Sequence, residues 1–111
     1  MRIAIVRGTV TSTQKDPSLT GVKFLVVQYV DLEGRPQPDY AVAADPVGAG
    51  AEEWVLVSQG SAARQPQGNE TRPLDAVVMA IIDTVSIGGR SLYNKRDQRE
   101  LGSLFPFPDV F

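Results

Sequence analysis

Carboxylates are the side chains of this chain whose spacing first suggests catalysis. Glu52 and Glu53 are adjacent, and Asp83 interrupts an otherwise apolar run. Neighbouring residues of an extended segment point to opposite faces, so the two glutamates would not share a substrate. We interpret the pair as the end of a solvated loop. Asp83 is interpreted as a strand residue that backbone amides or an arginine hold, rather than as a catalytic acid.

The chain contains no His and no Cys. The absence of His removes the commonest general acid or base near neutral pH, and Ser-His and Cys-His catalysis are excluded. A disulfide framework and a thiolate metal site are excluded as well. We therefore predict that the protein is not an enzyme, with no catalytic residues, no cofactor and no bound metal.

A short glycine-containing segment, Gly48-Ala49-Gly50, invites comparison with a phosphate-binding loop. No third glycine follows at the dinucleotide-binding spacing, and the Lys-Ser or Lys-Thr of a P-loop is missing. A tight turn is the better interpretation.

Aromatic residues of small β-barrels often stack on single-stranded nucleic acid in a basic groove. Here the candidates are Phe24, Tyr29, Tyr40 and Trp54, but residues 1–60 carry five basic and seven acidic side chains. The whole chain has a net charge of 11 − 13 = −2. We therefore expect these rings to pack in a core or an interface, and we expect no nucleic acid partner.

Five segments rich in β-branched and aromatic residues must position all these side chains. Gly8 within the first segment predicts a β-bulge, which helps a sheet curl into a barrel. One helical turn is expected from Ser61 to Arg64. The pattern predicts an all-β fold, a small five-stranded OB-like barrel with at most one short helix. The strands are predicted over residues 3–11, 22–30, 40–44, 54–58 and 76–85.

The length of 111 residues is within the range of one domain. No run approaches the ~20 apolar residues of a membrane span, so no membrane partner is expected. The apolar run near the N-terminus is too short for a signal peptide. A domain this small gains stability from subunit contacts, which makes self-association plausible.

Several blocks of the sequence, in the same order, resemble one family, the bacterial microcompartment vertex proteins of the EutN/CcmL family. The blocks are GTVTSTQK (8–15), LTGVKFLVVQY (19–29), VAADPVGAG (42–50), WVLVSQGSAAR (54–64), DAVVMAIIDTV (75–85) and SLYNKR (91–96). Several blocks in the right order are much more specific than one motif.

The resemblance implies a homopentamer that closes the corners of an icosahedral shell tiled by hexameric facet proteins. It favours a cytoplasmic location in the carboxysome shell, which supports CO₂ concentration for carbon fixation. Two alternatives stay open. One is the vertex protein of a catabolic microcompartment, and the other, from a different class, is an oligonucleotide-binding β-barrel module.

The resemblance also suggests site residues and domain limits. The turn of Gly60, Ser61, Ala62, Ala63 and Arg64 matches a family turn and is expected at the subunit interface or central ring. Asp45, Gly48 and Gly50 match a second, structural turn. The barrel domain is predicted over residues 1–96, with a C-terminal extension over 97–111. The extension has no counterpart that we recognise in the family. It contains Phe105, Phe107 and Phe111 between prolines, which motivates the hypothesis that it docks on a neighbouring subunit or a luminal shell adaptor protein. A disordered end is the alternative.

Overall fold

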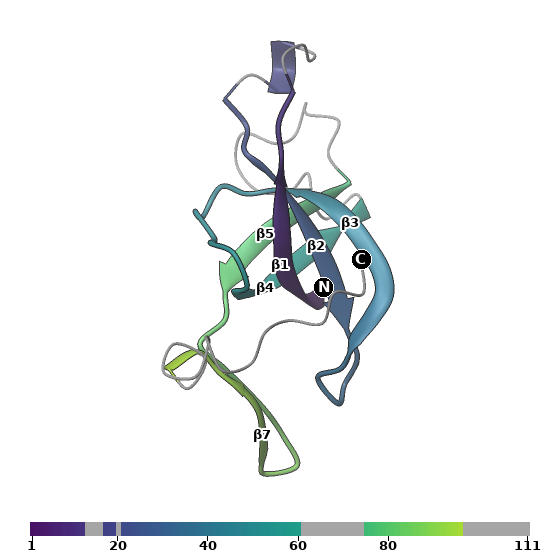
Figure 1. Cartoon of the computed structure of the whole chain (residues 1–111), viewed down its shortest axis with the longest axis vertical. Coiled ribbons are helices and arrows are strands. Elements are labelled where there is room, and N and C mark those ends of the chain that lie inside the picture. Colours follow the sequence, from purple (N-terminus) through teal and green to yellow (C-terminus); the bar gives the residue numbers. More distant parts are fainter. Residues whose placement is uncertain (13–16, 20, 61–74, 97–111) are drawn as a thin grey trace.

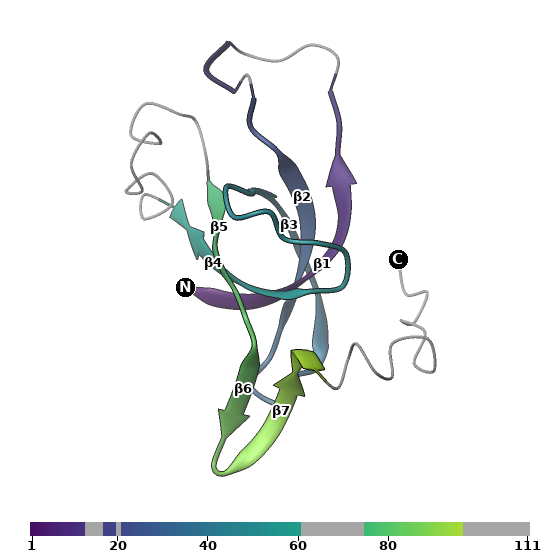
Figure 2. The same ribbon diagram turned by 90° about the vertical axis from the view of Figure 1, so that its left-hand side faces the viewer.

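The computed structural model describes residues 1–12, 17–19, 21–60 and 75–96. Five strands close into a barrel in the order β1-β2-β3-β5-β4, and two more form a separate hairpin. The hairpin projects from one end of the barrel, opposite the short 3₁₀ helix η1, Pro17–Leu19 (Figure 1, Figure 2). The strands are β1 (Arg2–Val10), β2 (Phe24–Val30), β3 (Pro36–Ala44), β4 (Trp54–Gln59), β5 (Ala76–Ile81), β6 (Thr84–Ile87) and β7 (Arg90–Asn94). The predicted all-β five-stranded barrel is confirmed, whereas the helical turn expected at 61–64 lies outside the described residues.

Alternate residues of the strands fill the barrel. Val6 lies opposite Val27 across β1 and β2, and Val57 lies opposite Val78 across β4 and β5. All four side chains are buried, because every second side chain of a strand points to the same face. The β-branched residues that predicted the strands therefore also form the core.

Gly8 lies at an irregularity in β1. The pairing of β1 with β2 shifts register between Val6 and Gly8, which confirms the bulge predicted at this glycine. The extra residue is Arg7. The bulge bends β1, as closure of a small barrel requires.

The barrel closes through one parallel contact between β3 and β5, at Ala44 and Val77. The other strand pairs are antiparallel. Directly after Ala44, the main-chain N–H of Asp45 donates to the Lys23 carbonyl at 2.8 Å, which extends the β2–β3 pairing by one residue.

The side chain of Asp45 organises the turn that follows. Its fully buried carboxylate accepts the N–H groups of Val47 at 3.1 Å, Gly48 at 3.0 Å and Ala49 at 2.8 Å. Lys23 Nζ lies 3.5 Å from the same carboxylate. Gly48 has a φ of 81°, which favours glycine, and the turn places Ala49 in the core.

Strand β3 begins earlier than the sequence predicts. A strand was expected over 40–44, but β3 starts at Pro36. Proline cannot donate a ladder hydrogen bond and is tolerated where one edge of a strand is unpaired. That condition holds here, since β3 meets β5 only at Ala44 and pairs along the rest of its length with β2.

The fifth predicted strand, 76–85, is wrong in its extent. The structure ends β5 at Ile81 and begins β6 at Thr84. Gly88 and Gly89 form a two-residue hairpin turn with φ values of 60° and 77°. Two successive residues with positive φ are typical of the tightest hairpins. The hairpin of β6 and β7 was therefore missed.

The hairpin is fixed to the barrel by aromatic and charged contacts. Trp54 of β4 stacks on Tyr93 of β7, with ring centroids 4.5 Å apart. Lys95 Nζ pairs with Glu53 Oε2 at 2.6 Å, and the Lys95 N–H donates to the Asp83 carbonyl. Stacked rings and a half-buried ion pair together hold the base of the hairpin.

Replacing Val57 by Ala should lower the free energy of unfolding by about 2 kcal/mol, because two methyl groups leave a closed core. Urea unfolding at matched protein concentration measures the change. Val47→Ala is the matched control, since Val47 is exposed and should change stability by less than about 0.5 kcal/mol. Equal losses in the two variants would contradict the assignment of the core.

Replacing Asp45 by Ala should lower the free energy of unfolding by about 3 kcal/mol, because three backbone donors lose their acceptor. Asp45→Asn keeps one acceptor oxygen and should lose clearly less. Thermal unfolding of the two variants beside the unmodified chain gives the comparison. Unchanged stability of Asp45→Ala would show that this turn does not support the barrel.

Candidate assembly surfaces

The carboxylates considered for catalysis do not converge. Glu52 Oε2 pairs with Arg7 Nη1 at 2.9 Å, whereas Glu53 pairs with Lys95. Asp83 is exposed in the turn between β5 and β6, so its predicted place within a strand is wrong. In the described part of the chain, no group of three or more acidic side chains is arranged as a metal site. Across the same residues, we find no helix with the length and hydrophobicity of a membrane span.

A buried polar cluster lies on the outside of β1 and β2, where the bulge turns Arg7 away from the core. The Arg7 side chain is only 5% exposed, and its Nε donates to Gln28 Oε1 at 2.8 Å. Gln28 Nε2 in turn donates to the Gln37 carbonyl at 2.9 Å. Glu52 completes the cluster from the loop before β4, with a φ of 67°, a strained value for a residue other than glycine. The cluster joins β1, β2 and the loop before β4. A structural role therefore explains the strained backbone of Glu52.

An apolar surface, the outer stripe, crosses β1, β2 and β3 on the face away from the core. Val42 is 53% exposed and Tyr40 is 42% exposed. Val26 lies opposite Val42 in the sheet, so the exposed groups adjoin across strands. Contiguous exposed apolar surface of this kind is typical of protein contacts. The outer stripe consists of Val10, Phe24, Val26, Tyr40 and Val42.

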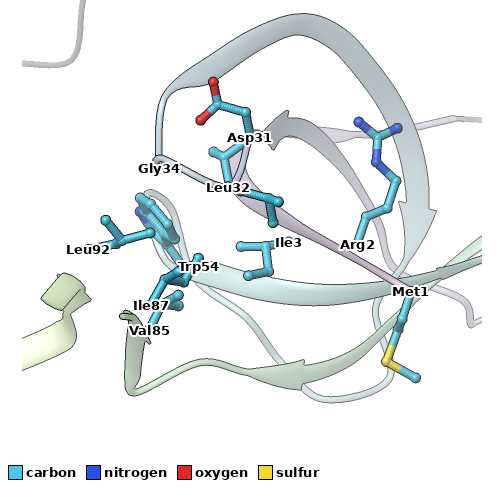
Figure 3. Close-up of a pocket in the computed structure, with 11 residues that line it drawn as sticks. Met1, Arg2, Ile3, Asp31, Leu32, Gly34, Trp54, Val85, Ile87 and Leu92 are labelled. Atoms are coloured by element: carbon cyan, nitrogen blue, oxygen red, sulfur yellow. The ribbon is translucent and has the colours of Figure 1, made fainter. Parts of the chain in front are cut away.

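A second apolar surface, the hairpin groove, lies between the barrel and the hairpin (Figure 3). Its volume is about 380 Å³. The turn after β2 forms one wall, where a Cβ added at Gly34 would make an ordinary van der Waals contact with the Trp54 ring at 3.5 Å. The groove is lined by Met1, Arg2, Ile3, Val30, Asp31, Leu32, Gly34, Trp54, Val85, Ile87 and Leu92.

Two buried tyrosines lie close to these surfaces. Burial raises the pKa of Tyr93 above its ordinary value, and a backbone hydrogen bond at Trp54 partly opposes the shift. Burial also raises the pKa of Tyr29, opposed by Arg2, whose guanidinium lies 3.8 Å from the centre of the Tyr29 ring. Both rings therefore stay neutral at physiological pH and act in packing.

The residues predicted from the family resemblance are only partly described by the structure. Gly60 directly follows β4, and its N–H donates to the carbonyl of Asp75, the residue before β5, at 2.8 Å. Ser61, Ala62, Ala63 and Arg64 lie outside the described residues. Gly50 has no positive φ, unlike Gly48, and its N–H instead donates to Glu53 Oε1 at 2.5 Å.

Neither apolar surface was identified from the sequence. Residues 22–30 are apolar on both faces of the strand through most of its length, and this pattern was the available signal for the outer stripe. The expectation that Tyr40 packs in a core or interface was a second signal. No feature of the sequence predicted the hairpin groove, because one of its walls is the hairpin of β6 and β7 that was missed.

Comparison with known proteins links the chain to a family of shell proteins. The family model described as "Ethanolamine utilisation protein EutN/carboxysome" matches residues 1–83. The carboxysome shell vertex protein CcmL of Gloeobacter violaceus is 63% identical over 88% of this chain and 98% of its own length. The bacterial microcompartment shell vertex protein EutN of Escherichia coli K12 is 41% identical over 86% of this chain and all of its own.

Solved structures agree with the sequence comparison. The structure of Gloeobacter violaceus CcmL superposes with a TM-score of 0.84, covering 87% of this chain and 100% of its own. GrpN, a pentameric microcompartment shell protein from Rhodospirillum rubrum, superposes with a TM-score of 0.71 at 42% identity, covering 78% of this chain and 98% of its own. The matched fold, the family model and the identities agree, and the chain belongs to the EutN/CcmL family.

Proposed function

We propose that the chain is a structural protein that assembles as a homopentamer and closes the vertices of a carboxysome shell in the cytoplasm. The observation that carries this proposal is its identity of 61–64% to five proteins named carboxysome shell vertex protein CcmL. The named EutN proteins are 40–41% identical, which favours the carboxysome over a catabolic compartment. These relatives are named as shell vertex proteins, which supports a role other than catalysis.

A closed ring explains why one small barrel carries exposed apolar surface. Five copies around one axis form heterologous contacts, so each subunit uses two different surfaces. A stable contact of this kind buries roughly 1,200–2,000 Å² in total around an apolar centre. The outer stripe, with Val42 and Tyr40 exposed in the single chain, supplies one such centre.

Arg64 and its turn are proposed to face the ring. Gly60 and Asp75 join the ends of β4 and β5 by a hydrogen bond, so the segment between them leaves and re-enters the barrel at one point. A turn held at its base in this way can reach the axis from each of five subunits. Flat facets of hexameric shell proteins are the proposed neighbours of the pentamer, because a hexagonal sheet needs five-fold points to close.

Co-expression with hexameric facet proteins tests this function. The unmodified chain should convert open sheets or tubes into closed polyhedral particles, scored by electron microscopy. Val42→Asp should abolish closure, since five carboxylates would be desolvated in the ring contacts. Val47→Asp places the same charge at an exposed site outside the outer stripe and should still close the shells. Equal closure with and without the chain would refute the proposal.

A further inference from the structure

The hairpin groove is more apolar than an open surface of a small domain usually is. Eight of its eleven lining residues are apolar, namely Met1, Ile3, Val30, Leu32, Trp54, Val85, Ile87 and Leu92. Leu32 is 79% exposed at the rim and Ile87 is 45% exposed. Large side chains held in this way around a concave site favour an apolar occupant.

The chain itself contains a segment with the chemistry of such an occupant. Residues 104–111 read Leu-Phe-Pro-Phe-Pro-Asp-Val-Phe, with one charged side chain, Asp109. Proline disfavours a regular helix and favours an extended chain, which would place Phe105 and Phe107 on the same side. Two rings at this spacing suit a shallow apolar groove.

The groove contains one cationic and one anionic side chain. Arg2 is the one cationic side chain among the groove residues, and it lies at the end of the groove near the start of β1. The other charged group there, Asp31, is already engaged by backbone N–H groups of its own turn, at 2.9 Å from both Glu33 and Arg35. Arg2 is itself paired with Asp39 at 2.8 Å, so the proposed contact depends on apolar groups rather than on charge.

Connectivity favours the groove of the same subunit. The described chain ends just after Lys95, which is fixed to Glu53 beside Trp54 at the groove wall. Seven residues, 97–103, separate Arg96 from Leu104. An extended link of this length reaches roughly 25 Å, longer than either wall strand of the hairpin. A short tether also gives the attached segment a high effective concentration at a nearby site.

We propose that residues 104–111 pack into the hairpin groove of their own subunit, with Phe105 and Phe107 against Trp54 and Leu32. The segment would bridge the barrel, the β2–β3 turn and the hairpin, and would cover the rim that is exposed without it. This goes beyond the proposed shell function, because the contact lies within one subunit and does not require the ring.

The exposed rim of the groove reports on whether the segment covers it, because Leu32 and Ile87 are 79% and 45% exposed without it. The Phe105→Ser/Phe107→Ser double variant should increase the labelling of Leu32 and Ile87 by hydroxyl radicals, measured by mass spectrometry. Val47→Ser is the control and should leave this labelling unchanged. Equal labelling of the rim in the double variant and the unmodified chain would overturn the proposal, because the segment would then not cover the groove.

The absence of cysteine allows a second test that separates the two possible sources of the segment. In the full-length Leu32→Cys/Phe107→Cys variant, mild oxidation should form a disulfide within one chain, found by peptide mass spectrometry. Val47→Cys/Phe107→Cys is the control pair and should stay reduced. Disulfide-linked dimers formed on mixing separate Leu32→Cys and Phe107→Cys chains would overturn the proposal, since they would place the segment on a neighbouring subunit.

Discussion

Closure of this five-stranded barrel depends on its shortest strand pairing, the parallel contact between β3 and β5 at Ala44 and Val77. Few backbone hydrogen bonds can join the two strands there. The residue after Ala44 therefore has to fix the direction of the chain. Asp45 does this with a buried carboxylate that accepts three N–H groups. A buried carboxylate is stable only with such complete hydrogen bonding, which makes the turn rigid and specific. A closed barrel has an interior of fixed size. The core side chains fill this interior, and the bulge at Gly8 and the loop before β4 fit the chain around it.

A closed barrel uses one face of each strand for its interior, and the other face has to find a different environment. In the part of the chain that the structure describes, three regions of the outer face show different solutions. The Arg7 cluster is polar and is hydrogen-bonded to Gln28, the base of the hairpin covers Trp54, and the outer stripe stays exposed. Exposed apolar surface is unfavourable in a monomer. It stabilises a ring, because assembly removes it from water. The proposed vertex function thus uses the surface that the barrel leaves uncovered.

The sequence predicted the features that depend on local pattern. Runs of β-branched residues located the five barrel strands, and Gly8 predicted the bulge that the register shows. The start of β3 was missed because Pro36 and Pro38 suggest a loop unless the free edge of the strand is known. The hairpin was missed because the Gly88-Gly89 pair ends a strand as readily as it joins two. Both apolar surfaces depend on which residues from distant segments adjoin, and that information lies in the pairing of strands rather than in any one segment.

Native mass spectrometry of the purified full-length chain at physiological ionic strength tests the central claim most directly, because it counts subunits. The account predicts a dominant assembly of five copies of the 12.0 kDa chain. A stable monomer or dimer under the same conditions would contradict it, since neither can occupy a five-fold vertex.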